Sequence, residues 1–170
     1  MRLFKESDLD AYAETMNKLE ARGDHLPLHI LNPVDLKKQF GENGMMDKDR
    51  GRFLIEEIGT GRIVGDVGFF RGTHYTNGYE IGYGIHSDED RGKGYCAEAI
   101  RILTKWIFNT KEINRLQICM DVDNIGSKRV AEKCGYKYEG MLRGVVYSRG
   151  EYRDLYIYGM TREDHKACAL

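Results

Sequence analysis

Residues 79–108 read YEIGYGIHSDEDRGKGYCAEAIRILTKWIF, and the hydrophobic pattern of this stretch changes half-way along it. Over residues 79–85 apolar side chains alternate with polar residues and glycines, which is the pattern of a β-strand. From residue 95 onward the apolar residues recur at helical spacing, as on one face of an amphipathic helix. The stretch therefore predicts a strand, a glycine-rich loop and a helix, in that order.

The loop between that strand and helix has the features of an anion-binding site. Two glycines let the backbone turn tightly, so that its N–H groups converge just before the helix begins. Unpaired amides and the positive end of the helix dipole bind phosphate groups, and two basic side chains add positive charge. The alternative is a plain turn between strand and helix. We predict an anion site formed by Arg91, Gly92, Lys93, Gly94, Tyr95 and Cys96.

The composition is ordinary for a soluble globular protein. The chain has 170 residues, of which 41% are hydrophobic and 31% charged. This length suits one domain with a substantial core, so we predict a single domain over residues 1–170. The formal net charge of −1 argues against general nucleic-acid binding, because that binding needs a broad basic surface.

The chain also lacks the signals of membrane insertion and of export. No apolar run approaches the roughly 20 residues of a membrane helix, and the start, MRLFKESDLD, has no apolar signal core. We therefore expect a cytoplasmic protein that does not bind membranes. No C-x-x-C spacing occurs, which favours reduced thiols and predicts no metal site. The cysteines are Cys96, Cys119, Cys134 and Cys168.

The remaining chain predicts further helices and strands around this central unit. We expect a first helix that is capped by Ser7, continues through Leu19 and ends at Gly23, and a second over residues 33–40. A polar loop over 41–50 is a plausible substrate-side lid. Strands are predicted over 53–58, 63–70, 115–122, 136–139, 145–147 and 152–160, and a short helix over 124–134. This order predicts an α/β (α+β) fold with a mixed, mostly antiparallel sheet and helices on both faces.

Three ordered motifs resemble those of the GNAT superfamily of N-acetyltransferases. The unit R-x-x-G-x-(small) at residues 91–96 looks like the family's acetyl-CoA motif. The sequence NIGSKRVAEKCGY at 124–136 resembles the second signature. The ending EG…GEYRD at 139–154 is similar to the branch of ribosomal-protein N-terminal acetyltransferases and spermidine acetyltransferases. The resemblance covers nearly the whole chain and implies a GNAT-like fold, acetyl-CoA as the acetyl donor and, at the family level only, a homodimer.

The resemblance also implies how acetyl-CoA would bind. The pyrophosphate would lie on the loop, and the pantetheine arm would pair with exposed backbone near Ile85 and His86. The thioester would lie where the strand over 79–85 separates from the strand over 115–122. Asn124 would contact the pantetheine arm. Many members carry a tyrosine where this chain has Ala131, so Ser127 becomes the candidate proton donor for the leaving thiolate. The alternatives are a cap role for Asn124 and a binding role alone for Ser127.

The reaction also needs a base, because the attacking amine must lose a proton. Glu80 and His86 share a strand face with two glycines, so Glu80 would border an open groove and is our candidate base. The alternatives for Glu80 are a solvated residue or an ion-pair partner. The weaker candidates for the base are Asp66, Asp121 and Asp123, and a water chain without a dedicated base is a further alternative.

Departures from the family pattern leave the acceptor open. Relatives often carry an aromatic residue in place of Gly84, proline in place of Ser87 and alanine in place of Cys96. Gly84 would leave extra room beside the acetyl group, and Cys96 is either a reactive thiol at a helix N-terminus or a small packing residue. We predict transfer of the acetyl group of acetyl-CoA to a primary amine, which attacks the thioester directly. The amine would belong to a protein N-terminus, a polyamine or a small amine-bearing metabolite or antibiotic. The alternative is a non-catalytic acetyl-CoA-binding regulatory module.

Overall fold

The computed structural model describes residues 1–26, 30–72 and 77–168. Its longer helices are α1 (Leu9–Met16), α3 (Pro33–Asn43), α4 (Tyr95–Thr110) and α5 (Ile125–Lys133), and its shorter ones are η1 (Glu6–Asp8), α2 (Leu19–Arg22), η2 (Asp88–Asp90) and α6 (Arg162–Ala167). The strands are β1 (Arg50–Glu56), β2 (Ile63–Arg71), β3 (Gly78–Ile85), β4 (Arg115–Asp121), β5 (Lys137–Ser148) and β6 (Glu151–Thr161).

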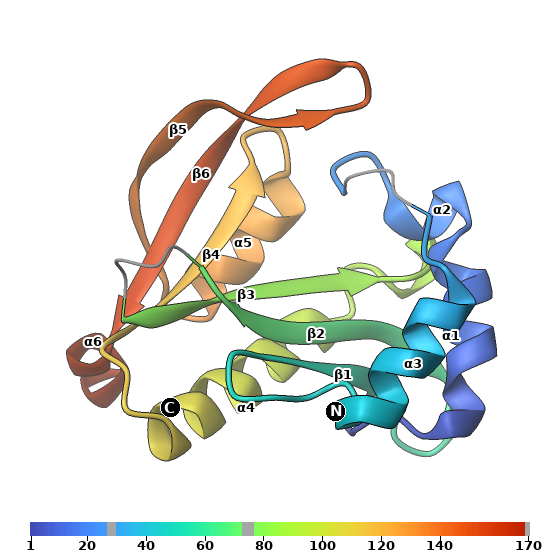
Figure 1. The fold of residues 1–170 in the computed structure, drawn as a ribbon. Coiled ribbons are helices and arrows are strands. Elements are labelled where there is room, and N and C mark those ends of the chain that lie inside the picture. The colour runs from blue at the N-terminus through green and yellow to red at the C-terminus, as the bar shows by residue number, and fades with distance from the viewer. Residues whose placement is uncertain (27–29, 73–76, 169–170) are drawn as a thin grey trace.

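All six of these strands form one sheet, in the order β1-β2-β3-β4-β6-β5 (Figure 1). Every neighbouring pair is antiparallel except β3 and β4, which run parallel because α4 connects them as a crossover. The predicted mixed, mostly antiparallel sheet is therefore confirmed, as are the strand, loop and helix of residues 79–108.

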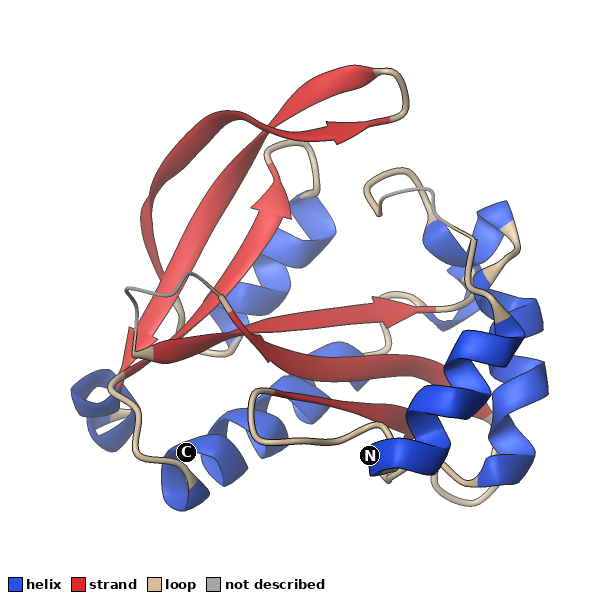
Figure 2. Cartoon of the chain, viewed as in Figure 1, coloured by secondary structure: helices blue, strands red, loops and turns tan. Residues whose placement is uncertain are grey.

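Helices cover both faces of the sheet (Figure 2). On one face α4 packs its apolar side, including Ile100, Leu103 and Ile107, onto the inward residues of β1 to β4 in the larger core cluster. On the other face α1 and α3 cover Leu54 of β1 in a second, smaller cluster. Adjacent residues of β1 point to opposite faces, which is why Leu54 belongs to one cluster and Ile55 to the other.

The parallel pair in the middle of the sheet separates after a short contact. Only three residue pairs join β3 to β4, ending at Glu80 opposite Gln117. Beyond them β3 continues with β2, whereas β4 continues with β6, and the two strands diverge like the arms of a V (Figure 1). We call this divergence the splay. It lies where the family resemblance implied a separation of these two strands.

Several sequence predictions need correction. The first helix does not begin at Ser7, since Lys5 caps a 3₁₀ turn whose residue Asp8 completes the capping box. It also ends at Met16. Leu19 begins the separate short helix α2, and 64% of the surface of Leu19 is exposed. The two strands expected over 136–139 and 145–147 are one continuous strand, β5, which two register shifts interrupt.

Helix α6 was missed by the sequence analysis, although the sequence carries a signal for it. Thr161 and Asp164 form a capping box, with the Asp164 backbone N–H donating to the Thr161 hydroxyl. In the described part of the chain, no helix combines the length and apolar character needed to cross a bilayer.

Candidate functional site: the loop before α4 and the splay

The backbone between η2 and α4 is open to solvent at the start of the longest helix. Gly92 and Gly94 have φ of +76° and +91°, a region that favours glycine, and side chains added at either would meet open space. Gly94 is the N-cap of α4 and has no side chain to cap the first-turn amides. Residues 91–94 are all exposed. Uncapped N–H groups at the positive end of a helix dipole are suited to bind an anion.

The basic side chains of this loop are paired with acidic residues of η2. Arg91 lies 2.6 Å from Asp88, and Lys93 lies 3.0 Å from Asp90. The Asp90 side chain is only 2% exposed and also binds Arg62. Arg62, followed by Lys93, holds the pKa of the Asp90 carboxyl below its usual range. The loop therefore offers an anion mainly backbone amides, with less free positive charge than the sequence suggested.

The two residues that follow, Tyr95 and Cys96, serve the architecture of the loop. The Tyr95 hydroxyl donates to the Glu57 carboxylate, which ties the start of α4 to the turn between β1 and β2. Cys96 is buried, and this burial raises the pKa of its thiol to about 12. The thiol is thus protonated at neutral pH, which supports the packing interpretation of Cys96 over a reactive one.

Beyond the last β3–β4 pair, no described strand pairs with the side of β3 that faces the splay, which leaves that side open to another extended chain. The His86 N–H donates to the carbonyl of Val64 in the β2 arm at 3.0 Å, and its Nε2 lies 3.0 Å from Asp66 Oδ1. Since successive strand residues direct their backbone groups to opposite sides, the groups of Ile85 face the splay. His86 itself is committed to β2.

Ser127 lies on the other arm of the splay, in the first turn of α5. Asn124 caps this helix, with its Oδ1 accepting from the Ser127 N–H at 2.9 Å. The Ser127 hydroxyl lies 2.7 Å from the hydroxyl of Tyr83, which reaches across from β3. The cap role proposed as the alternative for Asn124 is thus present. Ala131, where many relatives have tyrosine, is fully buried.

Glu80 lies at the closed end of the splay, on the face that Gly82 and Gly84 share. Its Oε2 accepts a hydrogen bond of 2.9 Å from Gln117 Nε2 and one of 3.4 Å from the Cys119 thiol. Burial, with a smaller contribution from Glu80, raises the pKa of Cys119 to about 12, so this thiol is a donor to Glu80 at neutral pH.

Two of the rival carboxylates, Asp66 and Asp121, are held by basic side chains. Asp66 contacts His86 and lies 3.4 Å from Arg52. Asp121 binds Arg153 at 2.8 Å, and the pKa of its carboxyl is lowered by the arginine although burial opposes this shift. Glu80 instead accepts from an amide and a thiol, which leaves its charge less compensated.

A segment that the sequence analysis did not single out, residues 23–26, lies across the splay. The Gly23 carbonyl accepts from Arg149 at the tip of the β5–β6 hairpin, and a side chain on Gly23 would collide with Arg91, 2.7 Å from Nη2. His25 Nδ1 lies 3.6 Å from Asp121 Oδ1. Leu26 lies over Gly84, 3.7 Å from where a Cβ would be. The room that Gly84 creates is therefore partly taken by Leu26.

The loop expected to act as a lid is placed elsewhere. Residues 41–43 complete α3, and Met45 is buried in the smaller cluster beside Leu54. Met46 pairs with Gly51 through an isolated bridge. This loop therefore packs on β1 at the far edge of the sheet, and residues 23–26 take the position next to the splay.

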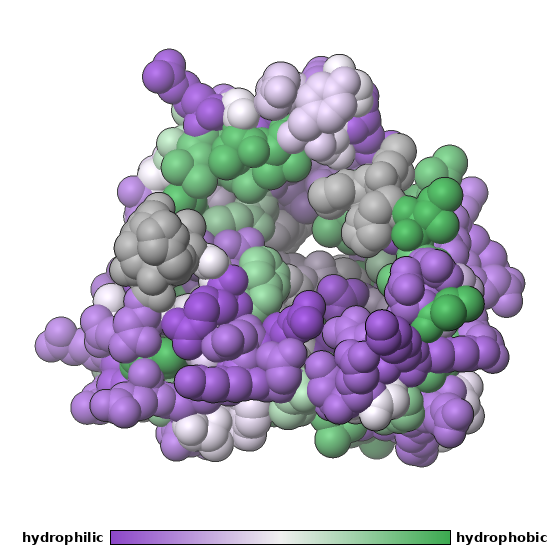
Figure 3. Space-filling model, in the orientation of Figure 1, coloured by the Kyte–Doolittle hydropathy of each residue, from purple (hydrophilic) through white to green (hydrophobic). Residues whose placement is uncertain are grey.

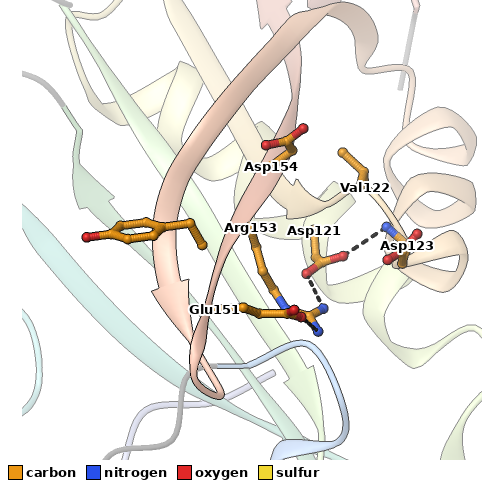
Figure 4. A pocket seen from close by; sticks show the side chains of 7 residues that line it. Asp121, Val122, Asp123, Glu151, Arg153 and Asp154 are labelled. Carbon is orange, nitrogen blue, oxygen red and sulfur yellow. Dashed lines mark hydrogen bonds and ion pairs between the residues drawn. The ribbon is translucent and has the colours of Figure 1, made fainter.

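A pocket of about 250 Å³ opens at the end of β4, beside the hairpin (Figure 4). Arg153 reaches across it to Asp121, and the other charged side chains around it are carboxylates. The surface over this side of the molecule is hollowed near its centre, below an apolar group on the hairpin (Figure 3). The pocket is lined by Asp121, Val122, Asp123, Glu151, Tyr152, Arg153 and Asp154.

Comparison with known proteins identifies the family of this arrangement. Residues 1–137 match the family model described as acetyltransferase (GNAT) domain. The chain is 32% identical over 138 residues to the SPbeta prophage-derived uncharacterized N-acetyltransferase YokL of Bacillus subtilis (strain 168), an alignment that covers 81% of this chain and 76% of YokL. It is 38% identical over 85 residues to YdaF of the same organism, but this covers only 50% of the chain and 46% of YdaF.

A solved structure shows the same fold over almost the full length. The spermidine N-acetyltransferase of Vibrio cholerae, in complex with CoA and spermine, superposes with a TM-score of 0.81 at 18% identity. The match covers 97% of this chain and 96% of that one. By the match of its family model and by its likeness to YokL, the chain belongs to the GNAT acetyltransferase family, as its ordered motifs predicted.

Proposed function

We propose that this protein transfers an acetyl group from acetyl-CoA to a primary amine by direct attack. The observation that carries the proposal is the joint position of three features. An uncapped helix N-terminus lies at one end of the splay, a free strand side lines one arm, and a serine hydroxyl lies on the other. These suit the pyrophosphate, the amide-rich arm and the thioester of acetyl-CoA, respectively.

The residues that would hold acetyl-CoA lie at the start of α4, on β3 and at the start of α5. The amides at the start of α4, from Gly94 to Cys96, would receive the pyrophosphate, with Arg91 and Lys93 beside them. The backbone of Ile85 would pair with the pantetheine arm. Asn124 would act mainly by holding the first turn of α5, and so Ser127, in place.

In the proposed reaction Glu80 serves as the base and Ser127 as the acid. The amine nitrogen attacks the thioester carbonyl, and Glu80 takes the proton that the nitrogen loses, directly or through water. The C–S bond then breaks with its electron pair on sulfur, and the Ser127 hydroxyl gives its hydrogen to that sulfur. Glu80 releases its proton to solvent and Ser127 regains one from solvent, so one proton moves from the amine to the thiol overall. Glu80 and Ser127 lie on opposite arms of the splay, as such a pair requires.

The charge near the splay favours a cationic acceptor. The pocket at the end of β4 carries four carboxylates and one arginine, and Glu80 adds a further negative charge on β3. A protonated amine is attracted to such a surface, which fits a polyamine or the N-terminus of a peptide better than an acidic metabolite. We therefore propose cationic amines as the acceptor class, with polyamines and peptide N-termini as its leading members.

An acceptor screen read by mass spectrometry tests the proposal. The protein is incubated with acetyl-CoA and one amine at a time, and the mass of each product is measured. The amines are spermidine, a set of peptides with free N-termini, small amine-bearing metabolites and aminoglycosides. We expect acetylated product with one cationic class and none with the N-terminally blocked peptides used as controls. The binding-module alternative predicts tight binding of acetyl-CoA and no acetylated product with any amine.

A further inference from the structure

Tyr83 is placed to act on the reaction although none of the family signatures quoted above assigns it a role. It lies in β3 three residues beyond the last β3–β4 pair, where the two strands have separated. Its backbone is fixed opposite Val67 of β2. Since Glu80 and Gly82 face the side of the proposed acceptor, the Tyr83 side chain, one residue on, faces the α4 and α5 side. Its ring packs against the larger core cluster.

The hydroxyl of Tyr83 makes two contacts with one residue of the opposite arm. It lies 2.7 Å from Ser127 Oγ, where either oxygen can be the donor, and it is also within reach to donate to the Ser127 carbonyl at 3.3 Å. The phenol has one hydrogen, and the shorter of the two contacts is the one to Oγ. The Ser127 amide is already held by Asn124 at 2.9 Å. Ser127 is thus fixed at its backbone by one partner and at its hydroxyl by another, and the direction of its O–H hydrogen depends on which oxygen donates.

We infer that Tyr83 is a positioning residue that donates its hydrogen bond to Ser127 Oγ and so directs the Ser127 O–H toward the thioester sulfur. This inference rests on the proposed function. In this arrangement the Ser127 oxygen accepts from Tyr83 and keeps its own hydrogen for the leaving thiolate. In the reverse arrangement Ser127 would donate to Tyr83, and its hydrogen would point away from the sulfur.

Tyr83 keeps its own proton throughout this step. Burial raises the pKa of the Tyr83 phenol above its ordinary value. The phenol therefore supplies a donor over the whole assay range and does not become a phenolate. A hydroxyl that accepts one hydrogen bond is a better donor of the next, so Tyr83 also polarises Ser127.

A double-mutant cycle tests this role. We expect Tyr83→Phe to lower kcat by about 10-fold, the effect of one lost hydrogen bond, with the KM for acetyl-CoA nearly unchanged. In a Ser127→Ala background the same Tyr83→Phe change should have almost no further effect, because Tyr83 acts only through that hydroxyl. The matched control is Tyr136→Phe, since the buried Tyr136 hydroxyl makes an equal contact of 2.7 Å with Thr104. This control should alter the melting temperature while leaving kcat nearly unchanged.

Each outcome of the cycle decides between roles. Multiplicative losses from Tyr83→Phe and Ser127→Ala, or equal losses of kcat in Tyr83→Phe and Tyr136→Phe, would show a structural role and overturn the inference. If the wild-type protein acetylates an amine and the variants show either of these patterns, the inference about Tyr83 fails while the proposed function stands. A wild-type protein that acetylates no amine would overturn both.

Discussion

Ser127 combines a local structural task with the proposed chemical one. Its amide closes the Asn124 cap, and its hydroxyl meets Tyr83 across the splay. Residue types alone predict the cap, because asparagine is favoured at that position. The partner of the hydroxyl was not predictable, since Tyr83 and Ser127 are 44 positions apart and meet only through the tertiary fold.

Replacing Ser127 with alanine should separate chemistry from binding. We expect turnover to fall by about 100-fold, the lower end of what general acid catalysis contributes, because the thiolate then leaves without a proton donor. Affinity for coenzyme A, measured by calorimetry, should change little, since the Asn124 cap uses the Ser127 backbone N–H and survives the change. A loss of affinity with unchanged kcat would assign Ser127 to binding alone.

At the scale of elements, the loop before α4 is the best-predicted part of the site. Its glycines, its place after a strand and the period of the following helix are all visible in the sequence. What the sequence did not show is the pairing of its cations with Asp88 and Asp90. Both pairs join residues three positions apart, a spacing that does not by itself specify an ion pair in a loop. Side-chain pairing in a loop is decided by the path of the backbone, and the four exposed residues 91–94, two of them glycine, permit several such paths.

Replacing Gly94 with leucine should weaken coenzyme A binding by about 10-fold or more, because a side chain there strains the backbone and crowds the amides that face the pyrophosphate. Gly44→Leu is the matched control. Gly44 also has a left-handed backbone, with φ of +62°, and also meets open space, but it ends α3 away from the loop. Calorimetry with coenzyme A should show a loss for Gly94→Leu only. Equal affinities in the two variants would contradict the loop assignment.

The Asp90 cluster should give the loop an acid-sensitive stability. The folded pKa of Asp90 lies below the value of about 3.9 expected in the unfolded chain. Its stabilising effect is therefore complete above that value and is lost as the pH falls through the folded pKa. We expect the gap in unfolding free energy between wild type and Asp90→Asn to be constant from about pH 7 to pH 5 and to narrow below about pH 4. Urea titrations at each pH measure it, and a gap that widens in acid would refute the pairing.

At the scale of the whole molecule, the splay is closed on one side by residues far apart in the chain. Segment 23–26 contacts Gly84 through Leu26, and it is held by Arg149 from the hairpin tip. Local patterns predicted the strands of the sheet, and the family resemblance implied the separation of β3 from β4. The predicted lid was misplaced, because which loop reaches the splay depends on how α1 and α2 pack.

Replacing Arg149 with glycine should loosen this closure without unfolding the hairpin. Arg149 has φ of +55°, a conformation that glycine adopts more readily, so the melting temperature should hold or rise. The acceptor KM should rise by about 5- to 10-fold, because the hydrogen bond from a charged donor to Gly23 is lost. Arg143→Ala, at an exposed position of the same hairpin, is the control and should leave the KM unchanged. If the KM for acetyl-CoA rises instead of the acceptor KM, Arg149 acts on the binding of acetyl-CoA, and the prediction is contradicted.

The measurement that tests the central claim most directly is thiol release from acetyl-CoA, followed with and without an amine. Direct transfer predicts that the protein releases no thiol when acetyl-CoA is the sole substrate. It predicts thiol release as soon as an accepted amine is added, in equal amount to the acetylated amine. Tight binding of acetyl-CoA with no release for any amine, or release without an amine together with an acetylated protein, would contradict the account.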